Sequence, residues 1–322
     1  MKRVCIIGCG AIGSLYAAHL ARVAEVWALV RREDHARALN QEELRVSGKH
    51  SFSVSLKATT TAKELPRDFD LGIVATKATQ VEEAIADAGG HFNNGAVISA
   101  QNGLGSEEII AAHTGGQVIR GTTFMSGTRH SDTHVQYELD TATWLGPFEP
   151  RETPMSVVQE AANLIIAGDL KAEALADARP AQWSKLIFNA SVNGVSALTG
   201  LPHSPHFAAE KQFDDLGHLL HELIAEGKQV AAAAGVKLHE DPWAMNKIGA
   251  MTNHPTSMLY DVRHQLPTEV DFLSGAIARE AERLGVSAPL HTTVYRLIRG
   301  KEAAWKFQEE NRPVVVQGRA GG

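Results

Sequence analysis

The feature that most constrains this chain is a glycine turn directly after an apolar run at its N-terminus. Val4–Ile7 is unbroken apolar sequence, and Gly8 to Gly13 has the spacing G-x-G-x-x-G. Apolar residues then recur at helical spacing from Ala11 to Val23. Strand, glycine turn and helix in this order predict a dinucleotide-binding turn, in which Gly10 lets a pyrophosphate approach the backbone closely. A turn of the same shape that binds no ligand is the alternative.

Length and charge narrow the class of protein. A chain of 322 residues is long for one hydrophobic core, so we expect two domains. A net charge of -6 without a local Lys/Arg cluster argues against nucleic acid as a partner. No apolar run reaches the roughly 18 residues of a membrane span, and the N-terminus lacks a signal-peptide pattern. We therefore expect a cytoplasmic protein without membrane contact.

Neither the cysteines nor the histidines predict a metal site. Cys5 and Cys9 are the two cysteines, and we expect both to be small packing residues, not a disulfide or a metal pair. His218 and His221 are three apart on a predicted helix, but no third ligand is evident nearby. A solvated helix face is the simpler interpretation of this pair.

The second predicted strand points to the type of dinucleotide. Glu25–Val30 reads as a strand and is followed by Arg31 and Arg32, about 20 residues after the glycine turn. NAD-binding chains usually place Asp or Glu there to contact the ribose, whereas a guanidinium matches a phosphate. The sequence therefore predicts NADP(H), with solvated arginines at a strand end as the alternative.

Strands and helices continue to alternate, which predicts an α/β fold with a doubly wound, parallel, Rossmann-type sheet. Buried strands are predicted at 70–76, 95–100 and 117–121, with helices at 80–88 and from residue 106. Lys77 and Asn102 follow two of these strands. Because ligands bind beyond the C-terminal ends of such strands, both residues are candidates to touch cofactor or substrate. Loop solvation, or a turn hydrogen bond made by Asn102, is the alternative.

The second half of the chain changes character. Earlier in the chain, 44–56 reads as a hairpin around Gly48; in the mixed segment before the boundary, 134–139 and 143–145 read as strands and 155–167 as a helix. Past Asp177 the strand signals stop, and helices are predicted at 179–197, 207–234, 243–251, 269–284 and 291–308. We predict a Rossmann-like NADP-binding domain over 1–176, an all-helical substrate domain over 177–310 and a frayed tail over 311–322.

One helix of the second half carries a distinctive polar stripe. Lys185, Asn189 and Asn193 are spaced four apart on an otherwise apolar or small segment, so they lie along one stripe about 12 Å long. Periodicity alone favours a solvent face. Asparagine, however, is a poor helix former, and an ammonium with two amides suits a polar ligand.

A capping pattern precedes the helix predicted at 269–284. Thr268, followed three residues later by Asp271, is close to a capping box. On this pattern alone, Glu269 is a first-turn carboxylate that favours the helix dipole.

Seven motifs together resemble the ketopantoate reductases (2-dehydropantoate 2-reductases) in order and approximate spacing. They are GCGAIGSLYAAHL, ATKATQ, QNGLG, GTT, WSKLIFNASVN, TSMLYDV and PTEVDFLSG, and the resemblance runs from residue 3 to about residue 300. It implies an N-terminal Rossmann domain, an all-helical C-terminal domain and an active site between them.

The resemblance also implies roles for individual residues. Lys185 would be the general acid, and Glu269 would hydrogen-bond the substrate hydroxyl. The cofactor would be held by Gly8, Cys9, Gly10, Ala11, Ile12, Gly13, Arg31, Lys77 and Asn102. The substrate would be bound by Asn102, Asn189, Asn193 and Ser257. Glu226 matches a family glutamate with a supporting role.

The implied reaction is NADPH-dependent reduction of a 2-oxo acid to a 2-hydroxy acid, most simply ketopantoate to pantoate. Three departures put the substrate in question: the segment 135–140 replaces small residues, Ser274 replaces the usual Asn, and Gly194 replaces Pro. A paralogue acting on another carbonyl is therefore one alternative. A non-catalytic NADP(H) sensor is a second. A 6-phosphogluconate-type or hydroxyacid dehydrogenase shares the architecture, but its own substrate signatures are not found in the helical half of this sequence. Exposed apolar helix faces could also support a homodimer.

Overall fold

A computed structural model describes residues 2–208 and 214–310. The chain divides into two compact units, one of residues 1–187 with 231–242 and the other of residues 188–230 with 243–322. The boundaries between them fall within α6 (Arg179–Thr199), near the end of α7 (Asp214–Ala233) and at the start of α8 (Pro242–Ala250). The domain limits expected from the sequence stay predictions, and the tail predicted at 311–322 lies outside the described residues.

The first unit contains an eight-stranded sheet of order β12-β11-β8-β7-β6-β1-β2-β5. The strands from β8 to β5 in this order all pair in parallel, whereas β11 runs antiparallel to β8. This confirms the doubly wound sheet. Its strands are β1 (Arg3–Ile7), β2 (Glu25–Leu29), β5 (Lys57–Thr59), β6 (Leu71–Val74), β7 (Ala96–Ser99), β8 (Gln117–Thr123), β11 (Thr143–Pro147) and β12 (Ala172–Ala174).

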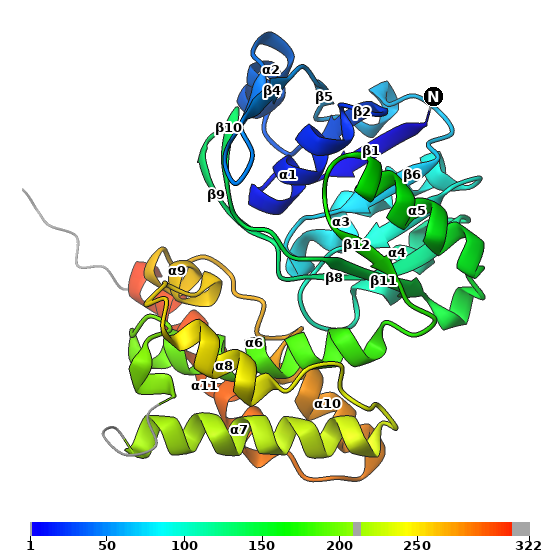
Figure 1. Cartoon of the computed structure of the whole chain (residues 1–322). Helices are drawn as coiled ribbons and strands as arrows, with labels where there is room; N and C mark the ends of the chain where they lie inside the picture. The colour runs from blue at the N-terminus through cyan, green and yellow to red at the C-terminus, as the bar shows by residue number, and fades with distance from the viewer. Residues whose placement is uncertain (1, 209–213, 311–322) are drawn as a thin grey trace, which may run out of the picture. The chain divides into compact units, whose positions relative to one another are not determined.

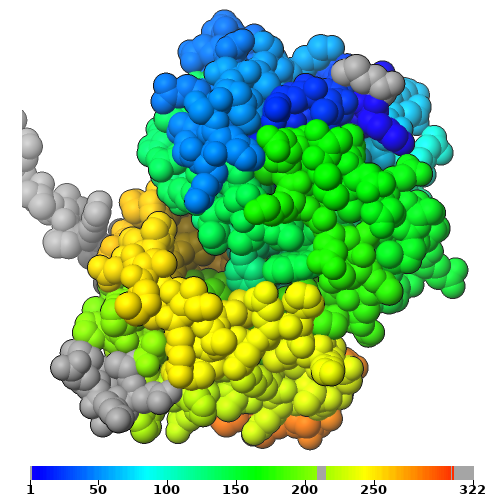
Figure 2. Space-filling view, in the orientation of Figure 1, coloured from blue at the N-terminus to red at the C-terminus, as the bar shows by residue number. Residues whose placement is uncertain are grey.

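Both faces of this sheet are buried, because alternate residues of each strand enter opposite cores. In β1, Val4 and Ile6 pack into one core, and Cys5 and Ile7 pack into the other. The first core is covered by α1 (Ala11–Leu20) and α5 (Met155–Ala167), and the second by α3 (Val81–Ala86) and α4 (Ser106–His113) (Figure 1). The green residues around α5 reach the surface of this unit (Figure 2). Ile166, on α5, is half exposed.

A second sheet, of order β4-β3-β10-β9, packs on α1 (Figure 1). Its strands are β3 (Leu44–Gly48), β4 (Phe52–Val54), β9 (Ser126–Ser131) and β10 (His134–Leu139). The predicted hairpin is confirmed, since Leu44 pairs antiparallel with Val54. Contacts with both sheets explain why every residue of α1 from Gly13 to Leu20 is buried.

The second unit is helical. Its described helices are the later part of α6, most of α7 (Asp214–Ala233), α8 (Pro242–Ala250), α9 (Ser257–Arg263), α10 (Ser274–Leu284) and α11 (Pro289–Glu310) (Figure 1). Part of the helix predicted at 207–234, residues 209–213, lies outside the described residues. The first unit also contains α2 (Glu33–Gln41) and short 3-10 helices at 62–64, 78–80, 89–92 and 149–151. The second unit has one further short 3-10 helix among its described residues, at 205–207.

The start of the helix predicted at 269–284 was wrong. Glu269 lies in a turn, and α10 begins five residues later at Ser274. Thr268 does not cap the helix, because the N-cap of α10 is Leu273. The Thr268 hydroxyl donates instead to Glu302 Oε1 on α11 at 2.7 Å. The turn closes instead through the amide of Phe272, which donates to the carbonyl of Glu269 at 3.0 Å.

Across residues 2–208 and 214–310, the search for a helix with the length and apolarity of a membrane span finds none.

Candidate functional site

The geometry of the glycine turn fits a dinucleotide. Gly8 has a φ of +91°, and a Cβ there would lie 2.6 Å from Thr76 Cγ2. A Cβ on Gly13 would lie 1.9 Å from the carbonyl oxygen of Gly8, so α1 can pack on β1 only with glycine at this position. At Gly10 a Cβ would meet nothing within 4 Å, which leaves open space beside the backbone. These are the properties that a pyrophosphate-binding turn requires.

The first turn of α1 can bind an anion. Gly10 is its N-cap and has no side chain to occupy the free N–H groups. The first backbone bond of the helix runs from the amide of Ser14 to the carbonyl of Gly10 at 2.9 Å. The amides of Ala11, Ile12 and Gly13 therefore precede the helical hydrogen-bond ladder, at the positive end of the helix dipole.

Cys9 contributes packing to this turn. Burial raises the pKa of its thiol to about 12, so the sulfur stays protonated near neutral pH. Cys5 and Cys9 are both buried and free of a disulfide, as the sequence predicted. In the described part of the chain, no group of three or more His, Cys, Asp or Glu side chains has the arrangement of a metal site.

The two arginines after β2 have different surroundings. Arg32 donates to Asp34 Oδ2 at 2.8 Å and forms a second ion pair with Asp132. Arg31 is exposed and makes no ion pair with any described residue. Its guanidinium is thus the one of the two that an incoming phosphate could bind without displacing a carboxylate.

The strand order brings the candidate residues of the first unit to one edge of the sheet. Arg31 follows β2, the glycine turn follows β1, Lys77 follows β6, and Asn102 follows β7. Lys185 reaches the same edge at the end of β8. Because neighbouring strands are about 4.8 Å apart, the four steps from β2 to β8 span about 19 Å. Along this edge, Arg31, the candidate for phosphate binding, lies at one end and Lys185, the candidate proton donor, lies at the other.

Lys185 is anchored at the end of β8. Its Nζ donates to the carbonyl oxygen of Thr123, the last residue of that strand. The ammonium also lies 5.4 Å from the centre of the Phe124 ring. The half-buried side chain therefore contacts both a backbone oxygen and an aromatic ring.

Two buried glutamines hold the loop that carries Asn102, and the sequence analysis missed both. Gln101 Nε2 donates to the carbonyl of Val74 at 2.7 Å, which ties the loop to β6. Gln182, on α6, donates from Nε2 to the carbonyl of Gly103 at 3.1 Å. Both contacts join residues far apart in the sequence, so no local pattern could have indicated them.

The remaining stripe residues of α6 belong to the second unit. Asn193 is 7% exposed and Asn189 is half-buried. Neither side-chain amide forms a hydrogen bond with a described residue, which is unusual for amides at this burial. Both therefore retain donors and acceptors for a polar ligand.

Two further candidates lie elsewhere in the second unit. Ser257 is exposed at the start of α9, where the Thr256 side chain caps the helix by accepting from the amide of Leu259 at 3.2 Å. Glu269 is 8% exposed, in the turn before α10. Ser257, the candidate for binding the substrate carboxylate, and Glu269, the candidate for binding the substrate hydroxyl, thus come from different elements of one unit.

Glu226 has a structural role. It is 7% exposed on α7, and its two carboxylate oxygens accept from the amides of Leu290 and His291 at 2.9 and 2.8 Å. These amides lie at the start of α11, where backbone donors lack helical partners. Glu226 therefore caps α11 from a neighbouring helix.

Two departures from the family pattern are packing positions. A Cβ on Gly194 would lie 2.6 Å from Val294 Cγ1, so glycine lets α6 and α11 approach closely. Ser274 Oγ donates to the carbonyl of Ala190 at 3.3 Å, which joins α10 to α6. The latter contact is one residue from Asn189.

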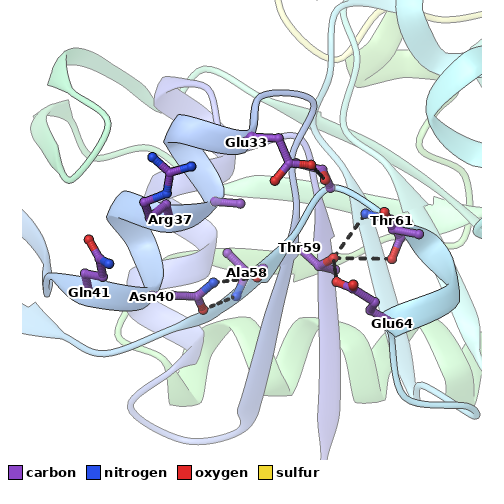
Figure 3. Close-up of a pocket in the computed structure, with 10 residues that line it drawn as sticks. Glu33, Arg37, Asn40, Gln41, Ala58, Thr59, Thr61 and Glu64 are labelled. Carbon is purple, nitrogen blue, oxygen red and sulfur yellow. Dashed lines mark hydrogen bonds between the residues drawn. The ribbon is translucent and has the colours of Figure 1, made fainter.

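A polar cavity of about 310 Å³ between α2 and β5 contains none of the predicted site residues (Figure 3). Its lining groups bind one another. Asn40 exchanges two hydrogen bonds with the backbone of Ala58, at 2.8 and 2.9 Å, and the Thr59 hydroxyl donates to Glu64. Several of its polar groups are therefore paired with one another, and the predicted site residues lie elsewhere.

Comparison with known proteins covers nearly the whole chain. The family model described as Ketopantoate reductase PanE/ApbA matches residues 4–150, and the model described as Ketopantoate reductase PanE/ApbA C terminal matches residues 177–302. A 2-dehydropantoate 2-reductase from Archaeoglobus fulgidus is 29% identical over 309 residues, which cover 94% of this chain and 99% of the relative.

Solved structures show the same fold. A PanE/ApbA family ketopantoate reductase from Ralstonia eutropha JMP134 has a TM-score of 0.84 at 24% identity, covering 95% of this chain and 100% of that chain. A ternary structure of D-mandelate dehydrogenase with NADH and anilino(oxo)acetate also has a TM-score of 0.84, at 20% identity and with the same coverage.

Proposed function

The chain belongs to the ketopantoate reductase family of nicotinamide-dependent oxidoreductases, and we propose that it reduces 2-dehydropantoate to pantoate with NADPH. The observation that carries this proposal is Lys185, held on the carbonyl of Thr123 at the sheet edge that also bears the glycine turn. Asn189 and Asn193 follow it on the same helix with amides that bind no described residue.

The cofactor would lie along the edge in the order of the strands. The backbone from Gly8 to Gly13, including Cys9, Ala11 and Ile12, would hold the pyrophosphate at the start of α1. Arg31 would bind the ribose 2′-phosphate, because it lacks the carboxylate partners of Arg32. Lys77 and Asn102, two and three strands along from β2, would lie toward the nicotinamide end.

The chemistry requires a proton donor at the carbonyl oxygen. When bound, NADPH supplies a hydride to the ketone carbon. Lys185 would stabilise the negative charge that grows on the oxygen and would transfer one proton to it, which completes the hydroxyl group. The ammonium is suited to both tasks, because it carries positive charge and N–H donors, and the Thr123 carbonyl that accepts from it holds it at the sheet edge.

Substrate recognition would fall to polar groups on and near α6. Asn189 and Asn193 would donate to substrate oxygens, Ser257 would bind the carboxylate, and Glu269 would accept from the substrate hydroxyl. Asn102, on the first unit, is a further candidate for a substrate contact. These groups together offer donors for an acid and an acceptor for the product alcohol.

A family paralogue that reduces a different 2-oxo acid is the second candidate. The observation that favours it is Ser274, which replaces the usual Asn and contacts α6 at Ala190, next to Asn189. A change at residue 274 alters the packing beside Asn189, a candidate for substrate binding, and does not change Lys185.

A panel of 2-oxo acids that includes 2-dehydropantoate, assayed for oxidation of NADPH and NADH side by side, tests the proposal. We expect the highest kcat/KM with 2-dehydropantoate and NADPH. A higher value with another 2-oxo acid would support the paralogue. Tight NADPH binding without turnover of any 2-oxo acid would contradict enzymatic reduction and favour a sensor.

A further inference from the structure

A buried network joins the loop of Asn102 to the helix of Lys185. Gln182 is 3% exposed on α6, one helical turn before Lys185. Its Nε2 donates to the carbonyl of Gly103 at 3.1 Å and to Glu107 Oε1 at 2.8 Å. Gly103 directly follows Asn102, so one amide links the backbone beside one candidate residue to the helix that carries the other.

The same amide also contacts the strand that anchors Lys185. Gln182 Oε1 accepts from Arg120 Nη1 at 2.9 Å. Arg120 is on β8, three residues before Thr123, and its other terminal nitrogen donates to Glu149 Oε2 at 2.9 Å. Gln182 is therefore bound on three sides, by the loop, by α4 through Glu107 and by β8.

The charged partners are held in place by this amide. Arg120 and Glu107 are buried, and their closest charged atoms are 3.7 Å apart, longer than a direct hydrogen bond. Burial raises the pKa of the Glu107 carboxyl, against the opposing charge of Arg120. Gln182 donates to one and accepts from the other, so it bridges a pair that does not bond directly.

We propose that Gln182 is a positioning residue, which fixes the distance between Asn102 and Lys185 by clamping the loop 101–105 to α6. This inference rests on the proposed function, because it assigns the clamp to the same reaction. An error of about 1 Å in the placement of reacting groups can cost about 100-fold in rate, so a clamp of this kind affects turnover. It leaves the glycine turn and Arg31, at the other end of the edge, unaffected.

The test compares Gln182→Met with wild type. Met keeps the volume and removes the amide, and we expect kcat to fall about 10- to 100-fold while the Kd for NADPH changes less than about twofold. Hydrogen–deuterium exchange of the amides at 103–105 should become faster. If the Met variant folds poorly, Gln182→Glu is the substitute. When ionised, its side chain can still accept from Arg120 but cannot donate to Gly103, so exchange in the same loop should again become faster.

Two controls separate positioning from stability. Gln159→Met, at an exposed site on α5, should change neither rate nor exchange. Arg120→Met leaves the Gln182–Gly103 bond in place. We expect this variant to have a lower Tm and a kcat near the wild-type value.

The outcomes separate the two proposals. A lower Tm for Gln182→Met, with kcat and loop exchange at wild-type values, would overturn the positioning role. A wild-type protein inactive on every 2-oxo acid would overturn the proposed function instead. Loop exchange needs no substrate and would still decide whether Gln182 clamps the loop.

Discussion

Lys185 donates its ammonium hydrogen bond to the carbonyl oxygen of Thr123, although α6 and β8 are separated by more than fifty residues of sequence. The contact fixes a flexible four-carbon side chain at the C-terminal edge of a parallel sheet, where ligands of such sheets bind. The carbonyl is a neutral partner and accepts from one of the three N–H groups of the ammonium. This combination is what a proton donor to a carbonyl oxygen needs.

Arg31→Ala should weaken NADPH binding far more than NADH binding. A charge-assisted bond to phosphate is worth about 1.5–3 kcal/mol, so we expect a loss of about 10- to 100-fold for NADPH. Fluorescence titration with both cofactors measures this difference. Arg32→Ala is the matched control, because that guanidinium is already paired with Asp34 and Asp132. Equal weakening of both cofactors by Arg31→Ala would refute the 2′-phosphate contact.

Asn193→Ala should impair substrate use and spare the cofactor. Loss of one neutral hydrogen bond costs about 0.5–1.5 kcal/mol, so kcat/KM for the 2-oxo acid should fall about 3- to 10-fold. The Kd for NADPH should stay constant. Steady-state kinetics at saturating NADPH measures the effect, with Asn163→Ala on the exposed face of α5 as the control. An unchanged kcat/KM would mean that Asn193 is part of the packing alone.

Glu226→Ala should destabilise the protein without acting on the chemistry. The change removes the acceptor of the part-buried Leu290 amide and of the buried His291 amide, at a cost of about 1–3 kcal/mol. Denaturant unfolding reports the loss, and Glu222→Ala, exposed on the same helix, serves as the control. If Glu226→Ala kept full stability and lost turnover, the residue would belong to the active site and not to the cap.

Stability should decline as the pH falls below about 6.5, where histidines titrate in the unfolded chain. Burial lowers the pKa of His19 and of His291 to about 4, so the unfolded chain binds protons that the folded protein excludes. The unfolding free energy therefore rises with pH between about 4 and 6.5. Urea unfolding at about pH 5 and about pH 7.5 measures how the unfolding free energy changes with pH. Both values lie above the pKa of most carboxyl groups, so histidines dominate the change.

His19→Gln should flatten that slope, whereas His218→Gln, at an exposed position on α7, should not. Stability that stays constant or rises on acidification through this range would contradict the argument.

Local patterns predicted the elements that position the site. The order of apolar run, glycine spacing and helical period fixed β1, the turn and α1, and the four-residue spacing placed Lys185, Asn189 and Asn193 on one helix. These features depend on neighbours in sequence. β9 was missed because its residues are polar and mostly exposed, so they lack the alternation of a half-buried strand.

Other features depended on contacts between distant residues. Thr268 looked like a cap, but its hydroxyl donates to the distant Glu302, and α10 begins later than its pattern indicated. The capping role of Glu226 and the clamp by Gln182 arise from pairs more than sixty residues apart. A single sequence contains the residues of such pairs but not their pairing.

The most direct test of the account is the turnover of Lys185→Ala with 2-dehydropantoate at saturating NADPH, beside its Kd for NADPH. Loss of a general acid that also stabilises charge should lower kcat by about 100- to 10,000-fold. The Kd should stay near the wild-type value, because the glycine turn and Arg31 are unchanged. A Lys185→Ala enzyme with near-normal kcat would contradict the assignment of Lys185 as the proton donor.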